Sequence, residues 1–318
     1  MISARVLARA AVVASMVMLV AGAVQANIII DTVPVGNPGN AADTTSYGAV
    51  SYAYSIGKYD VTAAQYCTFL NAVAATDSYG LYNTNMSGTT DAYPGITQSG
   101  SSGSYTYTVV SGRANRPVTQ VSFWNACRFA NWLNNGQPTG VAEGLGTTET
   151  GAYTLTATGM TNNTITRNAG ATWTVPSENE WYKAAYYDPT LNGGAGGYWM
   201  YPTQSNTISP AQANYTSPDT TDVGSYPYPS YYGTFDQGGN VYQWNDTIIN
   251  GSARGDRGGW CDGYYPVELK ATTPNQDFPS TPNRGIGFRV SEVPEPATLS
   301  LLALGGLGML MRRRSVRE

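Results

Sequence analysis

Glycine and proline interrupt this 318-residue chain repeatedly, with 36 and 18 copies. Both residue types favour tight turns and break helices and strands. Residues 81–111 are rich in Ser, Thr, Gly and Tyr, and we expect loops with one hairpin there. Neither a charged linker nor an internal repeat divides residues 27–292. The sequence therefore predicts a single domain with many turns and little long regular structure.

Three segments carry the start signals of helices. Thr62 with Gln65, and Ser177 with Glu180, match the capping box, in which two side chains satisfy backbone N–H groups of the first turn. Ser122 begins a segment whose apolar residues recur at helical spacing. We therefore expect helices that begin after Thr62, Ser122 and Ser177.

Two glutamates, Glu178 and Glu180, stand at the start of the third predicted helix. Paired carboxylates can serve as a general acid and a general base. Acidic residues in a first helical turn also complement the helix dipole, and we favour that structural interpretation.

Histidine is absent from the whole chain. This excludes a Ser-His-Asp triad, a Cys-His pair, and zinc or iron sites with histidine ligands. Any general base must be a carboxylate, a lysine, a tyrosine or a thiolate. The net charge is −4 and the main body has no Lys/Arg cluster, which argues against nucleic acid as a partner.

The cysteines are Cys67, Cys127 and Cys261, and their spacing forms no CxxC motif. Cys67 and Cys127 fall within the first two predicted helices, where we expect them to be small core residues. A disulfide between them is compatible with an oxidising compartment, and the sequence leaves the pairing of all three open.

Both ends of the chain have the composition of targeting signals. Residues 1–26 combine basic residues, an apolar run and a small-residue cleavage site, which predicts a secretory signal peptide; an N-terminal membrane anchor is the alternative.

Residues 293–318 contain Pro-Glu-Pro, a short apolar, membrane-spanning stretch over 297–311 and a cluster of arginines, and they resemble the PEP-CTERM sorting signal of bacterial envelope proteins. The resemblance implies that an exosortase-type enzyme recognises and removes the tail; a plain C-terminal membrane anchor is the alternative. Either way, we expect an exported protein at the cell envelope or outside the cell.

Six segments of the main body occur in an order that resembles the formylglycine-generating enzyme family, also called sulfatase-modifying factors. They are IGKYDVTAAQYCTFLN (56–71), RPVTQVSFWNACRFANWL (116–133), WTVPSENEWYKAAYY (173–187), YYGTFDQGGNVYQWNDT (231–247), RGGWCDG (257–263) and GIGFRV (285–290). The resemblance implies an α+β fold: a single irregular, loop-rich domain similar to C-type lectins. This agrees with the glycine and proline content.

The enzymes of this family oxidise a sulfatase cysteine to formylglycine with copper and oxygen, and two cysteines after an RGG motif form their active site. Arg257-Gly258-Gly259 matches that motif, and Cys261 follows it as the candidate catalytic residue. The second cysteine is missing, because residues 262–269 contain no sulfur. Cu(I) prefers soft sulfur ligands, and one thiolate does not reproduce a two-sulfur site.

The family also carries structural calcium, bound by asparagine side chains, backbone carbonyls and acidic groups. Asn214, Tyr215 and Asn240 match positions of these sites, and Gln243 stands where the enzymes have glutamate. The loss of that charge weakens a calcium site, although Ca²⁺ also accepts neutral oxygens. Structural calcium at one or more of these positions is therefore an expectation from the resemblance.

Two functions remain open. The first is a non-catalytic binding or scaffold module that recognises exopolysaccharide or an envelope protein. The 24 tyrosines suit such a module, because an aromatic face packs on a ligand while the polar tip finds a hydrogen bond. The second is a copper- and oxygen-dependent oxidoreductase that converts a sulfatase cysteine to formylglycine. We favour the first, since Cys261 lacks its partner thiolate.

Overall fold

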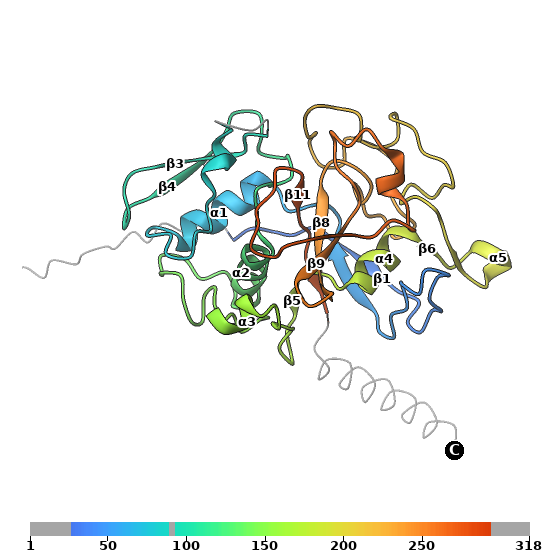
Figure 1. The fold of residues 1–318 in the computed structure, drawn as a ribbon, viewed down its shortest axis with the longest axis horizontal. Helices are drawn as coiled ribbons and strands as arrows, with labels where there is room; N and C mark the ends of the chain where they lie inside the picture. Colours follow the sequence, from blue (N-terminus) through green and yellow to red (C-terminus); the bar gives the residue numbers. More distant parts are fainter. Residues whose placement is uncertain (1–26, 89–92, 294–318) are drawn as a thin grey trace, which may run out of the picture.

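Two four-stranded sheets form the centre of the fold (Figure 1). The computed structural model describes residues 27–88 and 93–293. One sheet is antiparallel throughout, with the order β1 (Thr32–Val35), β2 (Tyr54–Gly57), β12 (Ser291–Glu292) and β5 (Trp173–Thr174). The other has the order β10 (Asn275–Asp277), β9 (Ala253–Arg257), β8 (Tyr242–Ile249) and β11 (Ile286–Gly287), in which only β11 runs parallel to its neighbour.

Two short hairpins lie outside these sheets. One pairs β3 (Ile96–Ser99) with β4 (Thr106–Val109), and the other pairs β6 (Tyr187–Asp188) with β7 (Gly197–Tyr198). The first confirms the hairpin that the sequence predicts within residues 81–111.

The three longest helices of the described residues begin directly after the expected caps. They are α1 (Ala63–Val73), α2 (Phe123–Asn134) and α4 (Glu178–Tyr186). The capping boxes at Thr62 and Ser177 are both present, and the Ser122 side chain accepts a hydrogen bond from the Asn125 N–H. All three predicted starts are therefore confirmed.

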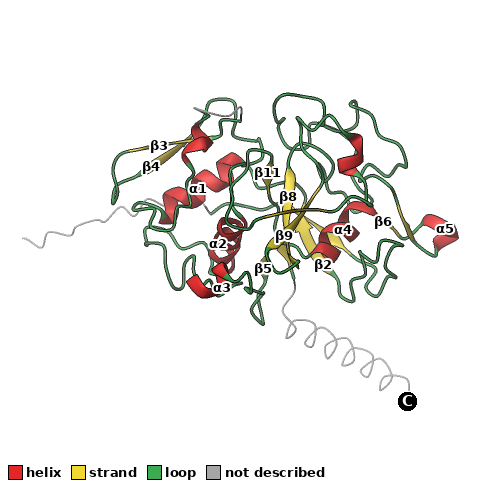
Figure 2. Ribbon diagram, viewed as in Figure 1, coloured by secondary structure: helices red, strands yellow, loops and turns green. Residues whose placement is uncertain are grey.

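Short elements and loops make up the rest of the described residues, as Figure 2 shows. The short helices are α3 (Ala157–Thr161) and α5 (Leu191–Gly194), with 3-10 turns η1 (Thr84–Ser87) and η2 (Pro266–Leu269). This confirms the expected loop-rich α+β fold.

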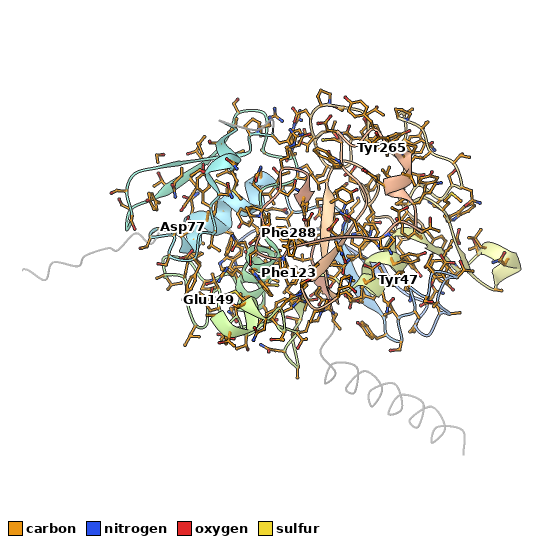
Figure 3. The ribbon with its side chains drawn as sticks, in the orientation of Figure 1. Tyr47, Asp77, Phe123, Glu149, Tyr265 and Phe288 are labelled. Carbon is orange, nitrogen blue, oxygen red and sulfur yellow. The ribbon has the colours of Figure 1, made fainter. Side chains whose placement is uncertain are left out.

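An aromatic cluster fixes α1 against α2. Tyr66 and Phe69 of α1 contact Phe129 of α2, with ring centroids 6.0 and 5.4 Å away, and Phe288 packs on Phe129 at 5.3 Å. Figure 3 shows Phe288 and Phe123 near the middle of the molecule. Since Phe288 belongs to the C-terminal segment, this core joins the two ends of the domain.

The two predicted targeting segments lie outside the described residues, apart from Val293. The Val293 N–H donates to the Thr172 carbonyl at 2.8 Å, so a backbone hydrogen bond holds the residue just before the Pro-Glu-Pro triplet. Among residues 27–88 and 93–293, none of the helices has the length and apolar character needed to cross a membrane.

Candidate functional site

The RGG motif forms a tight turn at the end of β9. Gly258 and Gly259 have φ angles of 108° and 72°, in the region that side chains rarely adopt. A Cβ on Gly258 would also lie 2.9 Å from the Gln237 carbonyl oxygen. Both glycines are therefore required by the backbone, which accounts for them without any catalytic role.

Arg257, the first residue of that motif, is a structural residue. Its guanidinium is 1% exposed, forms an ion pair with Glu178 and donates to the Ala271 carbonyl at 2.9 Å. It also lies 5.1 Å from the ring centroid of Tyr47 and 5.0 Å from that of Tyr182. These contacts fix Arg257 within the core on α4.

The two glutamates of α4 form ion pairs with different arginines. Glu178 pairs with Arg257, and Glu180 pairs with Arg167 at 2.6 Å while it also completes the capping box of Ser177. Arg167 holds the pKa of Glu180 below its usual value even though burial acts in the opposite direction. The structural interpretation thus extends beyond the helix dipole, because both carboxylates anchor α4 to distant segments.

Cys261 is fully buried immediately after the RGG turn. Its backbone N–H donates to the Asn240 carbonyl at 3.1 Å, and its carbonyl accepts from the Ser217 N–H at 2.9 Å. Burial raises the pKa of the thiol to about 11, and the neighbouring Tyr93 hydroxyl lowers it by a smaller amount. A raised pKa disfavours the thiolate, which is the nucleophilic form of cysteine.

The other two thiols belong to a different part of the molecule. Cys67 of α1 and Cys127 of α2 are buried in the core cluster around the two helices, and Cys261 is not a member of that cluster. Both are reduced, as is Cys261. The expected core role of Cys67 and Cys127 is confirmed, and the fold does not place a second cysteine in the turn that holds Cys261.

The structure brings together two of the four predicted calcium positions. The Asn214 amide donates to Asn240 Oδ1 at 3.2 Å and to the Asp219 carbonyl at 3.0 Å. Asn214 Oδ1 is buried and has no hydrogen-bond partner among the described residues. A buried oxygen without a donor fits a hard cation such as Ca²⁺. The Asp219 carboxylate, in contrast, already pairs with Arg113 at 2.8 Å.

The other two predicted calcium positions have different partners. Gln243 Oε1 accepts from Trp181 Nε1 and Arg289 Nε, each at 2.7 Å, so its lone pairs are already used. The Tyr215 carbonyl accepts from the Tyr264 N–H at 2.8 Å. Asn240 Oδ1 likewise accepts two hydrogen bonds, from the Asn214 amide and from the Thr221 N–H at 2.9 Å. Asn214 therefore fits calcium best of the four positions, and calcium binding itself stays a prediction.

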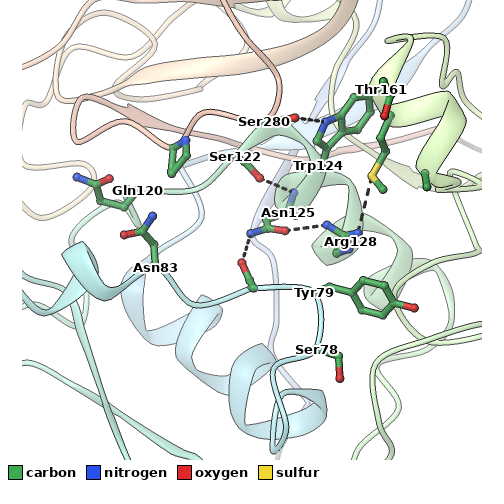
Figure 4. Close-up of a pocket in the computed structure, with 14 residues that line it drawn as sticks. Ser78, Tyr79, Asn83, Gln120, Ser122, Trp124, Asn125, Arg128, Thr161 and Ser280 are labelled. Carbon is green, nitrogen blue, oxygen red and sulfur yellow. Dashed lines mark hydrogen bonds between the residues drawn. The ribbon is translucent and has the colours of Figure 1, made fainter. Parts of the chain in front are cut away.

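A cavity of about 600 Å³ opens at the N-terminal end of α2, and none of the predicted catalytic or metal-binding residues lines it (Figure 4). Its walls come from the segment 78–83, from Gln120 to Arg128, from α3 and from Ser280 and Pro282. Sequence reasoning missed this cavity. The available signal was the polar and aromatic mixture of Trp124, Asn125 and Arg128 in one turn of α2.

The single charged side chain of the cavity lining, Arg128, is already neutralised. Its Nε and Nη2 donate to the two Glu149 carboxylate oxygens at 2.7 and 3.0 Å, and Nη1 donates to Asn125 Oδ1 at 3.0 Å. The guanidinium also lies 4.9 Å from the ring centroid of Tyr79. Arg128 therefore orders the wall and leaves the cavity without net charge.

Two protein-family models match this chain. Residues 4–293 match the sulfatase-modifying factor enzyme 1-like domain family. The chain belongs to this family. Residues 292–315 match the PEP-CTERM protein-sorting motif, which directs proteins to the cell envelope and is recognised by exosortase-type sorting enzymes.

Two chlamydial proteins share a segment with this chain. The serine/threonine-protein kinase Pkn1 of Chlamydia trachomatis is 46% identical over 117 residues, which cover 36% of this chain and 15% of the kinase. The corresponding protein of Chlamydia pneumoniae is 41% identical over 70 residues, which cover 22% of this chain and 10% of that protein. The chain thus spans a small fraction of these relatives.

Solved structures of similar fold cover most of the chain. CarF superimposes with a TM-score of 0.56 and 20% identity, covering 84% of this chain and 99% of that one. Treponema denticola variable protein 1 gives a TM-score of 0.52 and 17% identity, covering 83% and 95%. At these identities the likeness concerns the fold alone.

Proposed function

We propose that this protein is a non-catalytic binding module of the sulfatase-modifying factor family, displayed at the cell envelope. The observation that carries the proposal is the setting of Cys261, which is buried and has no second thiol in the RGG turn. Formylglycine formation in the family needs a pair of thiolates that hold copper. This chain retains the RGG turn and lacks the second cysteine of the pair.

Other residues near the turn do not replace the missing ligand. The chain has no histidine, and the nearest charged group of the motif, Arg257, is engaged with Glu178. Within the described residues no group of three or more Cys, Asp or Glu side chains is arranged to hold a metal ion. Copper chemistry at Cys261 would thus have to rely on a single buried sulfur.

The cavity at the N-terminal end of α2 supports a binding role. Its volume of about 600 Å³ lies within the range of small-ligand sites, and it mixes aromatic, amide and hydroxyl groups. Its ligand is a component of the cell envelope, either exopolysaccharide or an envelope protein, because the sorting motif brings the domain there.

The sorting motif also defines how the domain is presented. Because Val293 is hydrogen-bonded to the domain, the sorting tail follows the folded domain with almost no linker. An exosortase-type enzyme therefore cleaves next to the domain, and the protein is released or transferred at the membrane surface. The intact mass of envelope-extracted protein tests this: a chain that starts near Asn27 and ends near the Pro-Glu-Pro triplet is expected, and a full-length mass would contradict it.

Copper(I) affinity tests the absence of catalysis. Wild type, Cys261→Ser and the matched control Cys67→Ser are titrated with copper(I) against a chromophoric chelator under anaerobic conditions. We expect the same weak affinity for all three proteins. Tight binding that is lost only in Cys261→Ser would support the copper-dependent oxidoreductase instead.

A further inference from the structure

The cavity at the N-terminal end of α2 contains an amide that the fold holds in place and leaves unpaired. Gln120 is 5% exposed, and its side chain makes no hydrogen bond to any residue that the structure describes. Its backbone adopts a φ of 61°, fixed by a hydrogen bond from its N–H to the Asn283 carbonyl at 3.0 Å. A left-handed backbone at a residue other than glycine is uncommon. The residue is buried as a whole, and its unpaired amide lines the cavity, where a ligand can reach it.

Further hydrogen-bonding capacity faces the same cavity. Asn83 Oδ1 accepts from the Asn85 N–H at 2.9 Å, which leaves its NH₂ group without a partner in the described structure. The Ser122 hydroxyl accepts from the Asn125 N–H at 3.2 Å, and its own proton remains able to donate. Figure 4 shows Gln120, Asn83 and Ser122 along the cavity lining. The cavity therefore offers both donors and acceptors to a ligand.

An aromatic side chain borders these polar groups. Tyr79 is 44% exposed, and the Arg128 guanidinium covers one part of its ring at 4.9 Å from the centroid. The remaining ring surface is an apolar platform beside hydrogen-bonding groups, an arrangement that suits a ligand with one apolar face and polar edges.

The charge of the cavity selects against anions. Arg128 is the one charged residue of the lining, and it makes a bidentate ion pair with Glu149 in which both side chains are 6% exposed. An anionic ligand would have to compete with this buried carboxylate and would meet no unpaired cation. A neutral ligand has no such cost.

We propose that this cavity is the ligand site of the module and that it binds a neutral, polyhydroxylated ligand: a neutral sugar unit of an envelope polysaccharide. The inference rests on the proposed binding function and specifies its site and ligand class. Sugar hydroxyls pair with the Gln120 and Asn83 amides and with Ser122, while an apolar C–H face of the ring packs on Tyr79.

A glycan array with neutral, uronate and sulfated oligosaccharides, probed with the purified full-length chain, tests the ligand class. The strongest ligand is then titrated against Tyr79→Ala, Gln120→Asn and the control Tyr228→Ala, whose tyrosine is similarly exposed at 42% but lies outside the cavity. We expect binding to neutral glycans, with at least a tenfold loss in Tyr79→Ala and in Gln120→Asn and no change in Tyr228→Ala. Binding confined to charged glycans or to envelope peptides, no binding at all, or equal affinity in all variants would overturn the proposal.

A charge variant tests the selection against anions directly. Glu149→Gln leaves the Arg128 charge uncompensated, so binding of alginate, a uronate polymer, should increase at least tenfold relative to wild type. Unchanged alginate binding in a variant that melts as wild type does would contradict the charge argument. If Glu149→Gln does not fold, the Tyr79 and Gln120 variants still decide the proposal.

Oxygen uptake measured on the same preparations separates this inference from the proposed function. Glycan binding together with Cys261-dependent oxygen uptake would refute the non-catalytic function and keep the cavity as a ligand site. No glycan binding and no oxygen uptake would refute the cavity and keep the non-catalytic function.

Discussion

Arg289 and Asp60 form an ion pair of 3.1 Å in which neither side chain is exposed to solvent. The Arg289 guanidinium also donates to Gln243 Oε1 at 2.7 Å, to the Gly57 carbonyl at 2.8 Å and to the Phe235 carbonyl at 2.9 Å. The Arg289 side chain, from the GIGFRV motif, thus connects three parts of the fold. They are the end of β2 at Gly57, the loop at Asp60 and the GGNVYQW segment at Gln243. A buried hydrogen-bond network centred on Arg289 thus stabilises the fold of this family member.

Replacement of Arg289 by Met should be severely destabilising. The change leaves a buried carboxylate and buried carbonyls without donors, and breaking a buried pair in this way costs about 3–5 kcal/mol. Urea denaturation measures the free energy of unfolding. The control is Arg284→Met, whose pair with Asp262 at 3.4 Å is 35% and 25% exposed and should contribute about 1 kcal/mol or less. Its guanidinium also lies 5.0 Å from the Trp260 ring centroid, a partly exposed contact that should add a similarly small amount. Equal losses in the two variants would contradict the prediction.

Asp256 should make the protein less stable as the pH rises. Its carboxylate accepts from Asn275 Nδ2 at 2.7 Å, and burial raises its pKa from 3.8 to about 8. Because the folded state holds this proton more tightly than the unfolded chain, the free energy of unfolding falls between pH 3.8 and about 8. The slope from this group approaches about 1.4 kcal/mol per pH unit.

Asp256→Asn removes that titration and keeps the shape of the side chain. The variant should be more stable than wild type at pH 8, and the difference between the two should shrink toward pH 4. Denaturation curves recorded across this range give the comparison. Parallel pH profiles for the two proteins would show that the carboxylate is not held in its protonated form.

The native protein should react slowly with thiol reagents. Cys67, Cys127 and Cys261 are buried, and burial raises the pKa of each thiol. A disulfide-exchange reagent at pH 8 should modify all three cysteines in denatured protein and almost none in native protein. A thiol that reacts quickly in the native state and disappears in Cys261→Ser would identify Cys261 as reactive.

Calcium should raise the melting temperature of the protein above its value in EDTA. A ligand that binds the folded state alone stabilises it by about 2.7 kcal/mol when its free concentration is about a hundred times Kd. The unpaired Oδ1 of Asn214, beside Asn240, motivates this expectation. Asn214→Ala should abolish the shift, and magnesium should not reproduce it. Identical melting curves in calcium and in EDTA would remove the calcium proposal.

Local signals predicted the helices well. The hydroxyl of Thr62, Ser122 or Ser177 binds a backbone N–H a few residues further along the chain, so the cap and the helix are specified together. The burial of Cys67 and Cys127 followed from the apolar faces of those helices.

Long-range contacts could not be predicted in this way. The partners of Glu178 and Glu180 are Arg257 and Arg167, which lie on other segments, and thus the helix-dipole interpretation captured only part of their role. The cavity requires residues 78–83, the start of α2 and Ser280 to meet in space, and no spacing rule in the sequence relates these segments.

Oxygen uptake is the most direct test of the central claim that Cys261 supports no catalysis. The purified chain is supplied with copper(I) and with a peptide of the CxPxR type, and oxygen consumption is followed in wild type and in Cys261→Ser. The account predicts that both proteins consume oxygen at the rate of copper and peptide alone, and that the peptide cysteine is recovered unchanged. Copper-dependent uptake with conversion of the peptide by wild type, absent in Cys261→Ser, would contradict it.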